Sequence, residues 1–439
     1  MNPRLNRLLF QQTDIKVLAL FRMAIGLWFF VDYAGMILIG RVQEAYIDAQ
    51  VHFPFIGFEW VKPLPGWAMY AVFGVMAIAA LGILFGYRYR LAMLIFLIGQ
   101  VYVFMIDIVY TLNKFYLFII LAVVLIFIPA NRSWSLDVKW GRVKTLLTLP
   151  RWMLLIFQVS VGLIYFYSGL SKLNYDWLVL HQPLSNHLSW QWPFKVMGED
   201  TRAMVIALMS YGGAFFDLTI AGWLSFRKTR WFGHAYQISF HLLNFVLLGV
   251  GSLSIFMIVL TLLLFPPQWL QRKIQLQSFE GMQQPSSSAK RWTISLLSVY
   301  LLLNLLIPHR HYLIDNDVNW TEKGHRFSWR LMTRTKLGSN STFMITDNQT
   351  GEVWRINPRK YLTGRQYRKM SAETDLVIVF AHWLEAEWAR KGHDDVKING
   401  FINTQLNAHW KQLLIDPQLD LTQVKRTVWT DEVSTVLER

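Results

Sequence analysis

The fold of this chain turns on one long apolar run, HAYQISFHLLNFVLLGVGSLSIFMIVLTLLLFPPQ, residues 234–268. A helix that crosses a bilayer needs about 20 mostly apolar residues, so this run is longer than one crossing requires. Gly249 and Gly251 stand near its middle, and glycine permits a tight turn. The run is therefore either one tilted helix or two short helices.

Similar apolar stretches occupy the chain on both sides of this run. We expect further crossings at about 17–38, 67–87, 91–110, 113–130, 150–171, 204–226 and 292–308. Only 16% of the 439 residues are charged, against roughly 25% in an average soluble domain. The net charge of +15 comes from clusters between apolar runs, which indicates membrane orientation and argues against nucleic-acid binding. The sequence contains no cysteine, which excludes disulfides and thiolate metal sites.

The positions of the basic clusters decide between eight and nine helices. With nine helices and a cytoplasmic N-terminus, every dense cluster lies on the cytoplasmic side, as the positive-inside rule requires. With eight, Arg272, Lys273, Lys290 and Arg291 would lie outside. We therefore predict an α-helical membrane bundle of about nine helices in residues 1–308, followed by a small α/β domain, residues 309–439, on the outer face. The N-terminus lacks a cleavage-site pattern, so the first crossing is expected to act as signal and anchor.

The tail has the composition of a soluble domain. Two alternating segments flank Asn348-Gln-Thr-Gly351 in STFMITDNQTGEVWRIN, which predicts a β-hairpin. Segments 371–391 and 399–414 are predicted to be helices, and QVKRTVWT, residues 423–430, to be a further strand.

Polar residues within the apolar runs need partners, because an unpaired one costs several kcal/mol at membrane depth. Arg22 and Asp32 share the first helix but are too far apart to pair, so we expect each to contact other polar groups in the bundle. Asp217 is expected to pair with a basic group or a backbone donor. His234 and His241 lie on one face of a helix, with Asn244 a turn further on. A structural and a functional role are equally open for these residues. The pattern gives little support to a metal site.

The stretch YFYSGLSKLNYDWL, residues 165–178, places Lys172 at the end of the fifth helix. One interpretation is a lysine that extends to the membrane interface. The other is a buried lysine that desolvation makes neutral at ordinary pH, able to accept a proton. Spacing alone does not choose between them.

With this stretch the chain resembles the vitamin K-dependent γ-glutamyl carboxylase family, whose bacterial members are described as horizontally transferred transmembrane domain (HTTM) proteins. The resemblance covers nearly the whole chain, in the expected order. The segments that carry it are LALFRMAIG, HFPFIGFEWVKPLPGWAMY, IPANRSWSLD, YFYSGLSKLNYDWL, GGAFFDLTIAGWL, ISFHLLNFVLLGVGSLSIFMI, HRHYLIDNDVNWTEKGHRFSWRLM, TGEVWRINP and LLIDPQLDL.

The resemblance implies a lyase that oxidises reduced vitamin K with O2 to the epoxide. The strong base formed on the way removes a γ-proton from a peptide glutamate, and CO2 adds to give γ-carboxyglutamate. The family's base position is occupied by Lys172, and its seventh-helix histidine by His241. Further contacts to the quinol, menaquinol or phylloquinol, are expected from Asn113, Asn244, Trp177 and Arg22, with no metal. The implied partners are a glutamate-containing peptide and the lipid bilayer of a bacterial inner membrane, and no nucleic acid.

Two positions depart from the family pattern. Ser171-Lys172 stands where the best-known members have two lysines. Only the second lysine is kept, and it is the one that the family pattern assigns as base. Asn113-Lys114 stands where they have asparagine and histidine. Lys114 is a candidate catalytic residue that can stabilise an anion by its charge, but it does not shuttle protons near neutral pH as histidine does. The departure affects carboxylation more than quinol oxidation. It keeps open a non-enzymatic alternative, a membrane protein that binds peptides or assists export. A transporter is disfavoured because no inverted repeat is visible.

Overall fold

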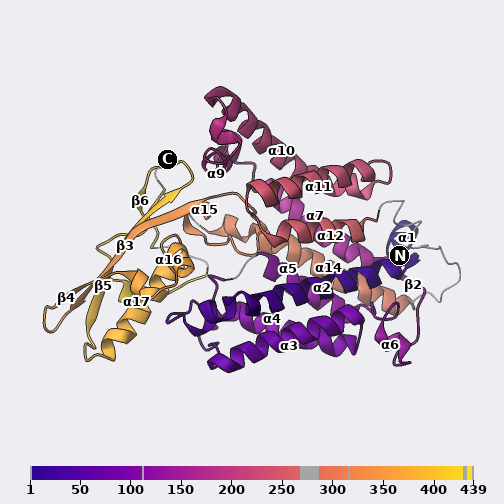
Figure 1. Ribbon diagram of the computed structural model, residues 1–439, viewed down its shortest axis with the longest axis horizontal. Helices are drawn as coiled ribbons and strands as arrows, with labels where there is room; N and C mark the ends of the chain where they lie inside the picture. Colours follow the sequence, from indigo (N-terminus) through magenta and orange to yellow (C-terminus); the bar gives the residue numbers. More distant parts are fainter. Residues whose placement is uncertain (1, 111–112, 267–285, 315–316, 429–432, 438–439) are drawn as a thin grey trace.

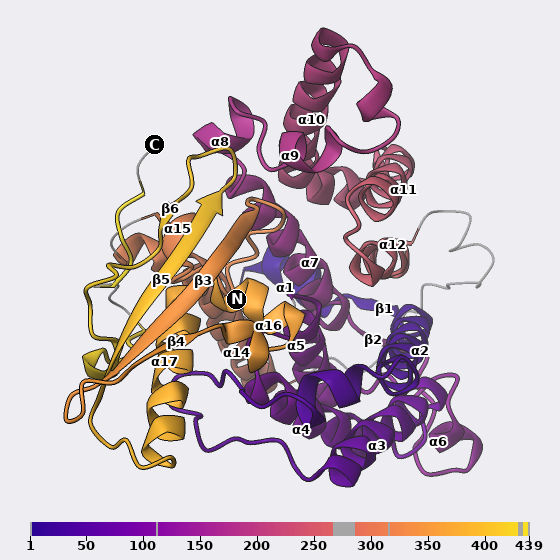
Figure 2. The same cartoon turned by 60° about the vertical axis from the view of Figure 1, so that its left-hand side comes forward.

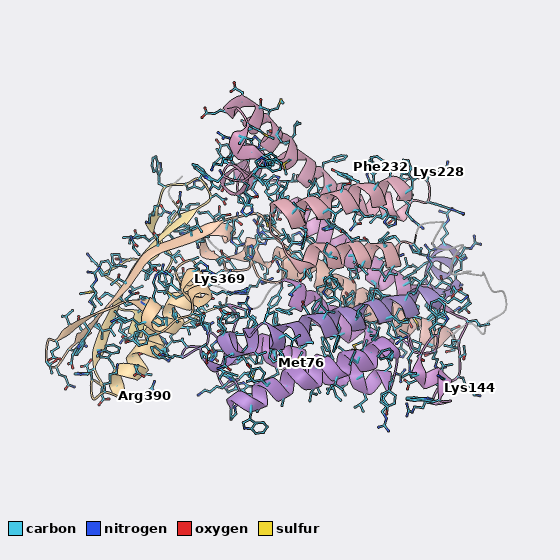
Figure 3. All side chains as sticks on the ribbon, viewed as in Figure 1. Met76, Lys144, Lys228, Phe232, Lys369 and Arg390 are labelled. Atoms are coloured by element: carbon cyan, nitrogen blue, oxygen red, sulfur yellow. The ribbon has the colours of Figure 1, made fainter. Side chains whose placement is uncertain are left out.

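The computed structural model describes residues 2–110, 113–266, 286–314, 317–428 and 433–437. A helical body is joined at one end to a smaller part built on a β-sheet (Figure 1). The end of the body that carries this part is called the capped end below. The opposite end, where Lys144 and Lys228 lie (Figure 3), is called the basic end.

Within the described ranges, nine helices run along the body. They are α2 (Lys16–Leu38), α3 (Gly66–Phe85), α4 (Tyr89–Ile106), α5 (Asn113–Phe127), α7 (Trp152–Leu170), α10 (Glu199–Ser225), α11 (Arg230–Leu247), α12 (Ser252–Leu264) and α14 (Ser287–Leu306). Among the described residues, six apolar segments are long enough to cross a membrane by length and composition, and α5 and α12 are shorter apolar helices. The protein is therefore a multi-pass membrane protein.

The long apolar run forms two helices. Helix α11 ends at Leu247 and α12 begins at Ser252. Gly249 and Gly251 between them have φ angles of 59° and 75°, a left-handed conformation that glycine adopts without steric cost. The prediction of two helices is confirmed. The helices of the body thus alternate in direction, and α1 and the sheet lie at opposite ends of the molecule (Figure 1).

Short elements complete the basic end. Helix α1 (Pro3–Phe10) precedes β1 (Gln12–Asp14), which pairs antiparallel with β2 (Thr148–Pro150), and α6 (Leu136–Lys139) follows α5. At the capped end the connections carry the π-helix η1 (Gln43–Ile47), helices α8 (Tyr175–Leu178) and α9 (Leu184–Leu188), and the 3-10 helix η2 (Phe194–Val196).

The C-terminal part contains a four-stranded antiparallel sheet in the order β4-β3-β5-β6. Its strands are β3 (Lys336–Asp347), β4 (Val353–Ile356), β5 (Val396–Leu406) and β6 (Gln412–Leu413). Helices α16 (Gly364–Met370) and α17 (Thr374–Ala389) pack against the sheet (Figure 2). Helix α15 (Val318–Thr321) and the 3-10 helices η3 (Ile307–Leu313), η4 (Pro358–Lys360) and η5 (Leu421–Gln423) join these elements. The predicted hairpin is present as β3 and β4, and α17 confirms the predicted helix at 371–391.

Two predictions for the tail were wrong. Residues 399–414 form most of β5 and then β6, not a helix. Alternate residues of β5 are buried, and this period of two is typical of a strand. The described residues of QVKRTVWT, 423–428, contain no strand.

Buried polar contacts fix the C-terminal part on the capped end. Gln366 of α16 donates to the Asp107 carboxylate at 2.9 Å and to the Val51 carbonyl at 2.7 Å. Asp176 of α8 accepts from Asn407 Nδ2 at 2.7 Å and lies 3.0 Å from His409 Nε2. Both carboxylates are buried, so separating the two parts would leave each without these partners.

Candidate functional site

A cavity of about 580 Å³ lies at the capped end, where α5, α7, α10, α11 and α12 meet. Its walls are largely apolar and aromatic, and a few polar groups converge on it. Trp329, Leu331 and Met332 of the C-terminal part line it as well. Both its volume and its lining are typical of a small-molecule site.

Lys172 lies in the turn after α7 and is 3% exposed. Its Nζ donates to Asp217 Oδ2 at 2.7 Å, to Ser168 Oγ at 2.8 Å and to the Leu331 carbonyl at 3.1 Å. The Trp177 ring lies 5.0 Å from Nζ, close enough for a cation–π interaction. The lysine is therefore buried and does not extend to the interface.

Asp217 of α10 lies next to Lys172 because α7 and α10 approach each other closely. A side chain at Gly169 of α7 would place its Cβ 2.8 Å from Leu218 of α10, so glycine permits this contact. Ser168 also donates to Asp217 Oδ2, at 2.6 Å. The predicted pairing of Asp217 with a basic group is confirmed. Lys172 and Asp217 thus form a buried ion pair.

A second lysine–aspartate pair borders the cavity. Lys114, in the first turn of α5, donates to Asp32 Oδ1 at 2.9 Å and to Oδ2 at 2.8 Å. It also donates to Ser252 Oγ at 3.3 Å. Asp32 comes from α2, so its polar partner inside the bundle is Lys114, and it does not pair with Arg22.

The histidines of α11 have different environments. His241 Nε2 lies 2.8 Å from the Tyr165 hydroxyl, and His241 lines the cavity beside Asn244. His234 lies 2.8 Å from the Phe265 carbonyl and outside the cavity lining. Among the described residues, no group of three His, Asp or Glu side chains is arranged to hold a metal ion.

The structure brings together six of the predicted site residues and separates one. Asn113, Lys114, Lys172, Trp177, His241 and Asn244 line the cavity. Arg22 lies at the basic end, where its guanidinium donates to the carbonyls of Ile83, Leu84 and Trp134 at 2.7 to 2.8 Å. In this position Arg22 links α2 to the end of α3 and to the turn before α6.

Sequence reasoning missed several residues of the site. It did not predict that Asp217 is the partner of Lys172, nor that Asp32 is the partner of Lys114, because both pairs join helices distant in sequence. It also missed Tyr165 and the carbonyl of Leu331. The intramembrane position of both aspartates was the signal available.

Comparison with known protein families agrees with this architecture. The HTTM domain family model matches residues 10–269, the part that holds most of the cavity. The family model for the lumenal domain of vitamin K-dependent gamma-carboxylase matches residues 289–435. No solved structure matches the chain. With both matches in chain order and together spanning most of the sequence, the chain belongs to the vitamin K-dependent γ-carboxylase family.

Proposed function

We propose that this protein oxidises a reduced vitamin K-type quinol with O2 to the epoxide and couples this to carboxylation of a peptide glutamate. The observation that carries the proposal is the buried pair of Lys172 and Asp217 facing a largely apolar cavity. An ion pair inside a membrane protein is expensive and is therefore a sign of function.

The cavity suits a flat, mostly apolar ring with polar substituents. The apolar wall includes Leu117, Ile164, Phe240 and Met257. Lys172, in the turn after α7, and Lys114, in α5, bring polar groups to it. Trp177 and Tyr165 add aromatic surface. A bound quinol would supply the reducing equivalents and the hydroxyl proton for the reaction with O2.

The pair of Lys172 and Asp217 provides a route for that hydroxyl proton. Transfer of one proton from Nζ to Oδ2, across 2.7 Å, leaves a neutral amine and a neutral carboxylic acid. The amine then accepts the hydroxyl proton and becomes an ammonium again. Asp217 keeps its proton, so the pair gains one positive charge beside the newly formed anion. Ser168, which contacts both partners, stabilises either state.

The C-terminal part contributes to the same site. Trp329, Leu331 and Met332 line the cavity, so a peptide bound to this part would reach it without crossing the bundle. The same residues limit the access of water, which protects a strong base from protonation by solvent. His241 and Trp177 are proposed to orient the bound molecule, with Asn113 and Asn244.

We further propose that the capped end faces outward from a bacterial inner membrane. Lys144 and Lys228 mark the basic end (Figure 3), and basic residues favour the cytoplasmic side. The N-terminus is then cytoplasmic, and the cavity lies near the outer surface, where an exported peptide would meet a quinol from the membrane.

The test incubates purified protein with reduced vitamin K, O2, labelled hydrogencarbonate and a glutamate-containing peptide. Epoxide and fixed label are expected from the wild type and from Lys195→Ala, an exposed lysine at the same end that serves as control. Lys172→Ala should abolish both products. Absence of both products in the wild type, or equal turnover by Lys172→Ala, would refute the proposal.

The non-enzymatic alternative rests on one observation. Asp32 neutralises Lys114 at the position where the family has histidine, so this lysine can serve a purely structural role. A protein of this kind would bind the peptide with equal affinity whether or not Lys172 is replaced, and it would not bind quinol. Titrations with peptide and with quinol separate the two functions.

A further inference from the structure

The first turn of α12 opens directly onto the cavity. Gly251, Ser252, Leu253 and Ser254 all line it. Gly251 is the N-cap residue, and no side chain in the described part of the chain caps the helix there. The first N–H groups of a helix have no acceptor within the helix, and the helix dipole makes this end positive. Such an end attracts anions, although it does not by itself define a site.

Ser254 supplies an independent sign of a ligand. It is 1% exposed, and its hydroxyl has no hydrogen-bond partner among the residues that the structure describes. A buried hydroxyl without a partner loses free energy relative to one in water. Because Ser254 lines the cavity, a ligand in the cavity can satisfy this hydroxyl.

Lys114 adds an ammonium donor at the same place, with its charge neutralised by Asp32. Asp32, which pairs with it, does not line the cavity, whereas Lys114 does. Ser252 Oγ accepts a hydrogen bond from Lys114 at 3.3 Å, so its own proton is left for donation. The start of α12 therefore combines two serine hydroxyls, helix N–H groups and a nearby ammonium.

We propose that this first turn of α12, with Ser254 as its key residue, is a subsite for a carboxylate-type anion. The identity of the anion rests on the proposed function: it is either the side-chain carboxylate of the peptide glutamate or hydrogencarbonate. The subsite lies at the start of α12, whereas Lys172 lies in the turn after α7 and Asp217 on α10, so the anion and the proton-accepting pair approach the cavity from different elements.

The experiment measures binding to the full-length protein in detergent, without quinol, so it does not depend on turnover. A glutamate-containing peptide and its glutamine counterpart are titrated by calorimetry, and ¹³C-hydrogencarbonate is followed by NMR line width. Ser254→Ala should weaken binding of the preferred anion about tenfold or more, the loss expected for one hydrogen bond to a charged group. Ser254→Thr, which keeps the hydroxyl, should restore most of the affinity.

Ser239→Ala is the matched control, because Ser239 also lines the cavity but lies on α11. A loss confined to the glutamate peptide identifies the side chain as the anion, and a loss confined to hydrogencarbonate identifies the CO2 source. Unchanged binding of both anions to a folded Ser254→Ala protein overturns the subsite. These outcomes are independent of whether the wild type forms epoxide, which tests the proposed function separately.

Discussion

Replacing Lys172 or Asp217 singly should destabilise the protein far more than replacing both. The two side chains are 4% and 5% exposed, so solvent screens their interaction little. Removing one partner of a buried pair leaves an uncompensated charge and costs about 3–5 kcal/mol, whereas an apolar replacement of both is often nearly neutral. Lys172→Met and Asp217→Leu should therefore each cost about 3 kcal/mol or more, and the double variant about 1 kcal/mol or less.

The assay is equilibrium unfolding in mixed detergent micelles, analysed as a double-mutant cycle. The expected coupling energy is about 5 kcal/mol or more, because the two single losses sum to about 6 kcal/mol or more and the double variant loses about 1 kcal/mol or less. Additive losses, with a coupling below about 0.5 kcal/mol, would refute the view that these side chains form one buried pair. A control cycle on Lys391 and Glu387, an ion pair at the C-terminal end of α17 whose side chains are 47% and 23% exposed, should give a coupling below about 1 kcal/mol.

Three further outcomes are expected. Arg22→Met should lower thermal stability without changing the KM for quinol, since Arg22 lies away from the cavity. Gly169→Val should separate α7 from α10 and abolish quinol oxidation in protein that still inserts into membranes. The Thr350 amide and the His393 side chain lower the pKa of Asp347 to about 2. This stabilisation is present above the ordinary carboxyl pKa and is lost as the pH falls toward 2. The protection of hairpin β3–β4 amides, measured relative to an unstructured peptide at the same pH, should therefore fall between about pH 4 and 2. Asp347→Asn should reduce this fall.

The helical body could be predicted from the sequence because its signal is local. An apolar run of sufficient length identifies a crossing, and the glycines at 249 and 251 marked the break between α11 and α12. The strand at 396–406 was missed because KINGFINTQL alternates apolar and polar residues only imperfectly. Its pairing with β3 also depends on residues far away in the chain.

The candidate site was predictable residue by residue but not as an arrangement. The resemblance to the family led to Lys172 and His241, and the cost of burying charge drew attention to Asp217 and Asp32. Which lysine pairs with which aspartate depends on how α2, α5, α7 and α10 pack, and no spacing within one helix contains that information. Arg22 was grouped with the site because its segment matched the family, although its contacts are at the other end of the bundle.

The hydrogen bond from Lys172 to the carbonyl of Leu331 joins residues 159 positions apart. Synthesis of the chain proceeds from the N-terminus, so α7 and α10 are complete long before Leu331 is made. During that interval Lys172 has Asp217 and Ser168 as partners but lacks its last acceptor. The cavity thus reaches its final form only after the C-terminal part has folded onto the bundle. A chain terminated before Trp329 would carry the lysine pair but lack part of the cavity wall.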